Sequence, residues 1–320
     1  MSPGGAAHDG PRPRSEPEAP GAASARGESS AAPSDPAVAE AVEGRPDDRD
    51  LPFDGHLHTL MSPDASVAID TYAAAAVARG IAEIAITDHV DFEPTAPAFA
   101  YADLATRERY VRDAADRWAD RGVRIRFGIE VTYQSRYEEE IREHLARGPY
   151  EHAIGSVHVM RDDPYTQDRV AAWVDGRSFA EIVAPYFAEV LAAARSGLFD
   201  ALGHLDFVKR YLAPLVPPAA FAASPETYEP ILAALVESGT GLEVNTSGLR
   251  QAAGETYPAP WVVARFHELG GTRVTVGSDA HVARSFAFGL GRGYDIATAA
   301  GFDDLTLGGR RGTAAGGRAG

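Results

Sequence analysis

The sequence contains no cysteine among its 320 residues. Disulfide bonds are therefore excluded, and so are thiolate nucleophiles and thiolate metal ligands. Any metal site in this chain must be built from histidine, aspartate and glutamate, and this set of ligands suits zinc, manganese or iron. The absence of cysteine also fits a cytoplasmic location, which is the location we expect.

Basic residues are scarce relative to acidic ones: 30 lysines and arginines stand against 46 aspartates and glutamates, for a formal net charge of -16. Binding a nucleic-acid backbone needs clustered positive charge, so we do not expect nucleic acid as a bulk partner. A small phosphorylated metabolite held by metal ions is compatible with the acidic balance. Long hydrophobic runs are also missing, so no membrane span is expected. The oligomeric state is left open.

Large apolar residues are nearly absent from the first fifty residues, which consist mainly of alanine, proline, glycine, serine and charged residues. Such a segment cannot bury enough apolar surface to offset its ordering entropy, so residues 1–50 are expected to form a disordered arm. This arm lacks the apolar region of a signal peptide. Residues 306–320 are expected to be a flexible tail. Residues 51–305 remain as one globular domain of ordinary composition.

Strand-like runs alternate with alanine-rich, amphipathic stretches throughout residues 51–305. Glycines follow several of these stretches, which is typical of helix ends. The alternation predicts parallel β/α units in a closed barrel, because no glycine-rich dinucleotide motif follows the first strand as it often does in the alternative, a doubly wound open sheet. The expected strands are 53–57, 83–87, 124–131, 152–157, 199–204, 240–245 and 273–276, and the expected helices are 69–79, 102–120, 137–147, 179–196, 225–237 and 260–269.

Each expected strand ends in a histidine, aspartate or glutamate, at the end where parallel barrels place their active-site groups. The first strand supplies His56 and His58, which share one face because side chains alternate along a strand. Six of the ten histidines lie at strand ends and favour a metal centre: His56, His58, His89, His158, His204 and His281. The other four are interpreted as surface or packing residues: His8, His144, His152 and His267.

These strand ends resemble the motifs of the PHP (polymerase and histidinol phosphatase) superfamily, from about Asp54 to Gly291. The motifs are segments 54–59 (DGHLHT), 87–89 (TDH), 128–130 (GIE), 156–158 (SVH), 203–206 (GHLD) and 277–281 (GSDAH). Segments 203–211 and 243–250 look in particular like the histidinol phosphate phosphatase branch. The resemblance implies a distorted (β/α)7 TIM-like barrel, in agreement with the seven expected strands.

The resemblance further implies a cluster of two or three divalent ions held by nine side chains, all of which have counterparts here. The implied ligands are His56, His58, Glu130 and Asp279 for the first ion, Glu130 again with His158 and His204 for the second, and Asp64, His89 and His281 for the third. Relatives carry either histidine or aspartate at the position of Asp64. A carboxylate there shifts the third site toward a harder ion or a different occupancy.

Such a cluster implies hydrolysis of a phosphate ester, in which a water activated by the ions attacks phosphorus in line. Glu130 has two carboxylate oxygens and is the expected bridge between ions, with a catalytic role. Asp206 is a candidate for proton transfer or for orienting His204, and the alternative is that it caps the following turn. The candidate substrate-binding residues are Arg161, Lys209, Asn245 and Arg250.

The resemblance leads us to expect a metal-dependent phosphomonoesterase that converts L-histidinol phosphate to L-histidinol and phosphate in histidine biosynthesis. One alternative is a PHP-type phosphatase or phosphodiesterase that acts on another phosphorylated metabolite or on short nucleic acid. A second alternative is a non-catalytic PHP-like binding domain. The complete set of nine ligands argues against this second alternative.

Overall fold

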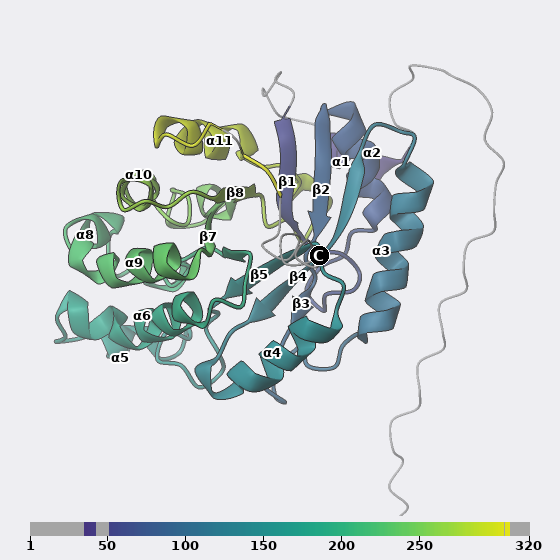
Figure 1. Cartoon of the computed structure of the whole chain (residues 1–320). Helices are drawn as coiled ribbons and strands as arrows, with labels where there is room; N and C mark the ends of the chain where they lie inside the picture. The colour runs from purple at the N-terminus through teal and green to yellow at the C-terminus, as the bar shows by residue number, and fades with distance from the viewer. Residues whose placement is uncertain (1–34, 43–50, 304, 308–320) are drawn as a thin grey trace, which may run out of the picture. The chain divides into compact units, whose positions relative to one another are not determined.

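The computed structural model describes residues 35–42, 51–303 and 305–307 (Figure 1). Most of the arm expected at residues 1–50 and of the tail expected at 306–320 lies outside these ranges. Residues Pro36–Val42 form helix α1, which differs from the expectation of an arm without structure. The physical reason is local: Val38 and Ala41 fall on one face of the helix, and both are buried.

Parallel strands form the centre of the fold, in the order β1-β2-β4-β5-β6-β7-β8, with the short strand β3 paired beside β4. Their bounds are Leu51–Leu57 (β1), Ile81–Ile86 (β2), His89–Val90 (β3), Arg124–Thr132 (β4), His152–Ser156 (β5), Ala201–Leu202 (β6), Gly241–Asn245 (β7) and Val274–Gly277 (β8).

The two ends of this sheet meet through backbone hydrogen bonds just beyond β8. The His58 N–H donates to the Ala280 carbonyl at 3.0 Å, and the Asp279 N–H donates to the His56 carbonyl at 2.9 Å. These bonds join β1 to the segment after β8 and close the barrel at its carboxyl end. The expected parallel β/α barrel is therefore confirmed, and the open sheet is excluded.

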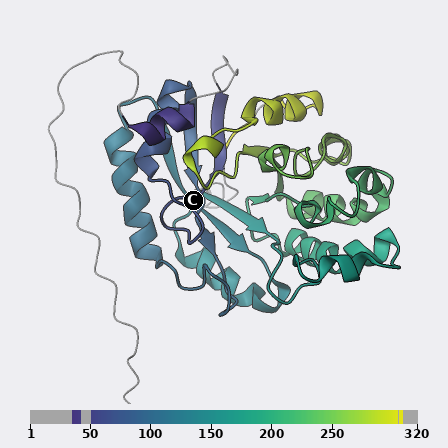
Figure 2. The same cartoon turned by 180° about the vertical axis from the view of Figure 1, so that it is seen from behind.

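Helices lie outside the strands, with α3 on one side and α6, α9 and α10 on the other (Figures 1 and 2). The longer helices are α2 (Ile69–Ala78), α3 (Leu104–Trp118), α4 (Glu138–Arg147), α6 (Phe179–Ser196), α9 (Glu229–Ser238), α10 (Pro260–Glu268) and α11 (Leu290–Ala299). The shorter ones are α5 (Val170–Val174), α7 (Lys209–Leu212) and α8 (Pro218–Ala222). No described helix has both the length and the apolar character that crossing a bilayer requires.

Helix α6 illustrates why the sequence folds in this way. Ser178 and Glu181 form a capping box at its start, and each side chain bonds to the backbone N–H of the other. Gly197 ends the helix in the left-handed conformation, with φ of 60°. Between these signals Val183 and Tyr186 belong to the face that packs against the core.

Strand β6 is shorter than expected, since it covers only Ala201–Leu202 of the predicted range 199–204. Gly203 lies so close to β5 that a Cβ atom there would be 2.4 Å from the Ser156 hydroxyl. His204 then leaves the extended conformation, with φ of 20°. The chain therefore turns at a candidate ligand, and the His204 imidazole reaches Glu130 on β4, with 2.9 Å between Nε2 and Oε1.

Candidate metal centre

The nine predicted ligands converge at the carboxyl end of the barrel. They lie on β1, β3 and β4, in the loop after β1, and in the segments that follow β5, β6 and β8. His56 and His58 are fully buried, and their ring centres lie 5.0 Å apart. The pairing of β3 with β4 sets His89 directly opposite Glu130. Because the strands are parallel, all of these ends meet at the same edge.

A first group consists of four atoms around one point: His56 Nε2, His58 Nε2, Glu130 Oε2 and Asp279 Oδ1. The two histidine nitrogens lie 3.3 and 3.4 Å from Glu130 Oε2, and 3.8 and 3.4 Å from Asp279 Oδ1. Tetrahedral bonds of zinc length imply ligand separations of about 3.3 Å. Among the described residues, His56 Nε2, His58 Nε2 and Glu130 Oε2 are buried without a hydrogen-bond partner. This geometry fits a bound cation.

A second group uses the other oxygen of Glu130. Glu130 Oε1 lies 3.4 Å from His158 Nε2 and 2.9 Å from His204 Nε2. The two imidazole nitrogens are 3.3 Å apart. Glu130 thus presents one oxygen to each group, which is the arrangement expected of a carboxylate that bridges two ions.

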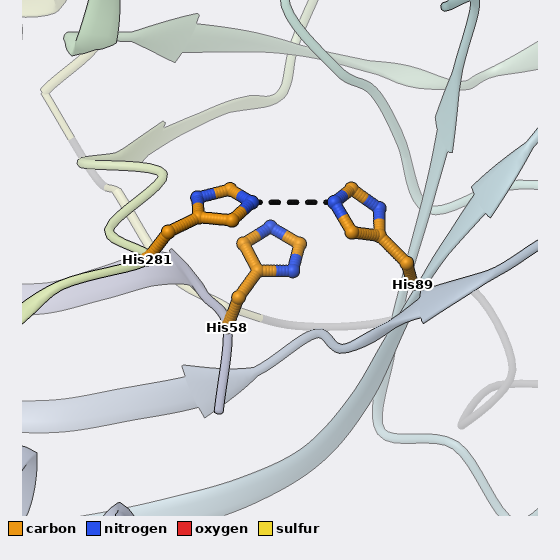
Figure 3. A group of neighbouring side chains, drawn as sticks. All are labelled: His58, His89 and His281. Atoms are coloured by element: carbon orange, nitrogen blue, oxygen red, sulfur yellow. Dashed lines mark hydrogen bonds between the residues drawn. The ribbon is translucent and has the colours of Figure 1, made fainter. Parts of the chain in front are cut away.

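A third group joins Asp64 Oδ2 to His89 Nε2 at 3.5 Å and to His281 Nε2 at 3.3 Å. The two imidazole nitrogens face each other at 3.3 Å, and the ring of His58 stacks against both rings (Figure 3). This group is more open than the others, because 55% of the Asp64 side chain and 26% of the His281 side chain are exposed. His89 Nδ1 also lies 2.8 Å from Glu130 Oε2, which connects the third group to the bridge.

Charge in the centre is balanced between carboxylates and imidazoles. Burial alone would raise the pKa of Glu130, but the imidazoles of His56, His89 and His158 hold that pKa well below its usual range. Burial would lower the pKa of His56, but the carboxylates around it, first that of Glu243, raise the pKa well above its usual value. The pKa of His58 falls well below its usual value because of burial and the neighbouring imidazoles. The ionised carboxylate of Glu130 and the neutral ring of His58 are donors that suit a divalent ion, and a bound ion would displace the proton that the surrounding carboxylates favour on His56.

Further side chains contact the ligand rings at their Nδ1 atoms. Glu243 Oε1 lies 2.6 Å from His56 Nδ1, and Thr132 Oγ1 lies 2.9 Å from His158 Nδ1. Each contact leaves Nε2 directed at the centre. No role was predicted for Glu243 or for Thr132. The signal for Glu243 in the sequence is its place as the acidic residue near the end of the sixth expected strand.

Asp206 and Lys209 form a buried ion pair, with 2.7 Å between Lys209 Nζ and Asp206 Oδ2. The hydroxyl of Tyr228 donates to the same oxygen at 2.9 Å, and Lys209 Nζ also contacts Glu255 at 2.6 Å. Neither Asp206 nor Lys209 lines the cavity beside the centre. The structure therefore does not bring these two candidates to the place where a substrate would bind.

Asn245 and Arg250 support the Asp279 turn. Asn245 Nδ2 donates to Glu243 Oε2 at 3.1 Å and to Asp279 Oδ2 at 3.4 Å. The Arg250 guanidinium donates to the carbonyls of Ser278 and Asp279, at 2.8 and 2.7 Å. Both side chains act on the backbone or carboxylate of a ligand, and neither lines the cavity.

The remaining described histidines lie outside the three groups. His144 Nε2 lies 2.7 Å from the Tyr150 hydroxyl, and the His267 ring packs edge-on against Phe302. His152 is buried at the start of β5. His8 lies outside the described residues.

A cavity of about 850 Å³ opens beside the centre. Its lining includes His158 and His281 together with three arginines, Arg136, Arg161 and Arg210. Arg136 is paired with a glutamate of the same wall, and among the described residues Arg161 and Arg210 form no ion pair. Arg161 was a predicted substrate-binding residue. Arg210 was missed, although it directly follows the candidate at position 209.

Fold and site together define a parallel barrel with a histidine- and carboxylate-rich metal centre at its carboxyl end. Residues 54–247, more than half of the chain, match the family model described as PHP domain. The chain therefore belongs to the PHP domain family, as the motifs indicated.

The chain is also similar to proteins named as histidinol-phosphatases. A protein of Deinococcus radiodurans named "Probable histidinol-phosphatase" is 31% identical over 231 residues, which cover 71% of this chain and 85% of that protein. The histidinol-phosphatase of Lactococcus lactis is 26% identical over 79% of this chain and 93% of its own length. The crystal structure of the Lactococcus lactis histidinol phosphate phosphatase, complexed with zinc, L-histidinol and phosphate, matches with a TM-score of 0.70 and 24% identity, over 81% of this chain and 97% of that chain. The structural match shows that the fold is shared.

Proposed function

We propose that this chain is a metal-dependent phosphomonoesterase that hydrolyses L-histidinol phosphate to L-histidinol and phosphate. The observation that carries the proposal is the convergence of all nine ligands in three groups beside an open cavity. The names of the relatives, and the zinc, histidinol and phosphate in the solved structure, support this substrate. The reaction is the one expected in histidine biosynthesis.

The centre holds three divalent ions in this proposal, one in each group, with Glu130 between the first two. Zinc is supported by the solved relative, and manganese and iron also accept imidazole and carboxylate ligands. Bound ions supply Lewis-acid polarisation of the phosphoryl group and lower the pKa of a water molecule. The ligand side chains hold this charge in place, and the positioning contacts of Glu243 and Thr132 keep two of the rings aimed inward.

Arg161 and Arg210 bind the substrate phosphate in this proposal. Both line the cavity, and each follows a segment that carries a ligand of the second group, His158 or His204. A guanidinium offers two parallel N–H donors to phosphate oxygens, and an arginine without a carboxylate partner keeps these donors available. Arg136 differs because its guanidinium already forms an ion pair with Glu93.

Replacing either Arg161 or Arg210 with alanine is expected to lower kcat/KM for a phosphate monoester by ~10²-fold, because charge-assisted contacts to the phosphoryl group are lost. Steady-state kinetics on the metal-loaded variants measures this change. Arg195→Ala, at an exposed position on α6, is the matched control and should retain wild-type kinetics. Wild-type kcat/KM in both cavity variants would contradict the assignment.

The substrate proposal is tested by measuring phosphate release from a panel of esters by the metal-loaded protein. We expect kcat/KM for L-histidinol phosphate to exceed that for O-phosphoserine, p-nitrophenyl phosphate and a p-nitrophenyl phosphodiester by ~10²-fold or more, because a site that bonds the polar groups of its substrate rejects analogues without them. Faster turnover of another monoester would refute the histidinol phosphate assignment. Faster turnover of the diester would instead favour the phosphodiesterase alternative.

A further inference from the structure

Strand β7 supplies none of the nine predicted ligands, yet its carboxyl end contacts ligands from three other segments. Glu243, which is 1% exposed, receives the closest of these contacts. Its Oε1 lies 2.6 Å from His56 Nδ1, and its Oε2 accepts from the His204 backbone N–H at 2.9 Å. His56 belongs to the first group and His204 to the second. One buried carboxylate therefore touches both groups that share Glu130.

We propose that Glu243 is a positioning residue, which sets the tautomer of the His56 ring and holds the His204 turn, so that both groups keep their affinity for metal. The proposal rests on the metal centre alone and does not depend on which substrate the protein hydrolyses.

The contact with His56 decides which ring nitrogen faces the centre. An ionised carboxylate only accepts hydrogen bonds, so the His56 nitrogen beside Glu243 must carry the proton. With an ion bound, this assignment leaves the lone pair on Nε2, the atom that lies 3.3 Å from Glu130 Oε2 and 3.8 Å from Asp279 Oδ1. A ring in the other tautomer would direct an N–H at the position of the ion.

The contact with His204 supports an unusual backbone conformation. His204 and Asp279 are two non-glycine residues with positive φ, at 20° and 53°. Such conformations persist only where the surroundings hold them. Glu243 holds the first through the His204 N–H, and its neighbour Asn245 contacts the carboxylate of Asp279. The end of β7 thus supports the ligand turns on both of its neighbouring strands.

The packing of β8 leaves space for this carboxylate. A Cβ atom added at Gly277 would lie 2.6 Å from Glu243 Oε1 and 2.4 Å from His56 Cβ. Only a residue without a side chain therefore allows Glu243 to reach the His56 ring. The space left by Gly277 is an observation separate from the hydrogen bonds, and it also locates the Glu243 carboxylate beside His56.

The test is Glu243→Gln, which keeps the size of the side chain but replaces one acceptor oxygen with a donor NH₂. The amide oxygen can serve His56 or the His204 N–H, but not both. We expect the metal affinity to fall by ~10–100-fold, the usual effect of losing a residue that orients a ligand. Titration of metal-free protein with Co²⁺, followed by its visible absorption, measures affinity, and elemental analysis after dialysis measures the ions retained.

Two variants serve as controls. Glu237→Gln makes the same chemical change at an exposed position on α9 and should retain wild-type affinity. Glu243→Asp keeps the charge with a shorter reach and should bind Co²⁺ with intermediate affinity. Wild-type affinity and stoichiometry in Glu243→Gln would overturn the proposal.

A measurement on the unmodified protein tests the proposal even if the glutamine variant does not fold. In the zinc-loaded protein, ring ¹⁵N NMR should show His56 with a proton on Nδ1 and with Nε2 bound to zinc. Coordination of zinc through Nδ1 of His56 would overturn the proposal.

Discussion

Glu130→Ala is expected to reduce turnover of a phosphate monoester by at least ~10³-fold. The reason is geometric. One oxygen of Glu130 lies 3.3–3.4 Å from the Nε2 atoms of His56 and His58, and the other lies 2.9 Å from that of His204. Loss of this side chain therefore removes a ligand from two positions at once, together with the negative charge between them.

The measurement combines kinetics with metal content, because the expected loss originates in the ions. Elemental analysis should show fewer bound ions in Glu130→Ala than in the wild type, while circular dichroism shows an unchanged fold. Glu130→Gln keeps one acceptor oxygen and should retain ions in only one of the two groups. Glu237→Ala, on an exposed face of α9, is the control and should behave as the wild type. Full activity in Glu130→Ala would show that this residue is not the bridge.

Removal of metal by a chelator is expected to abolish turnover, and the ions should leave in a defined order. The third group should release its ion first. Its ligand Asp64 has 55% of its side chain exposed and His281 has 26%, whereas His56, His58 and Glu130 are at most 1% exposed. Exposed ligands exchange with water and chelator more readily than buried ones.

Stepwise dialysis against increasing concentrations of chelator, with the metal content measured at each step, checks this order. We expect a plateau at two ions per chain before the remainder is lost, and recovery of activity when divalent ions are added back. Asp64→Ala should begin at that plateau. Loss of all ions in a single step in the wild type would contradict the distinction between an open group and a buried pair.

The barrel was predictable because its signals are local. Apolar runs, alanine-rich amphipathic stretches and helix-ending glycines such as Gly197 are read from neighbouring residues, and they placed seven strands that the structure also contains. Two of the differences from the predicted elements have evident physical causes. Strand β6 is short because the chain turns at His204, and residues 36–42 form a helix because Val38 and Ala41 find a buried surface.

The candidate site was predictable to a similar degree. The HxH spacing of His56 and His58 and the acidic or histidine residues at later strand ends mark positions that parallel strands must bring to one edge. The roles suggested for Lys209 and Arg250 had no such basis, since a cation after a strand can face the cavity or the protein interior. Both turn inward here, the first to Asp206 and the second to backbone carbonyls.

The motifs of the sequence by themselves indicated the family, and the alternation of strands and helices predicted the parallel barrel and the strand ends at which the candidate ligands meet. Only the tertiary structure decided how the atoms are shared. It directed the two oxygens of Glu130 to different groups, placed Glu243 against His56, and left Arg210 beside the cavity without a carboxylate partner among the described residues. These contacts join segments far apart in the chain, and the stagger of the strands and the packing of side chains set their distances.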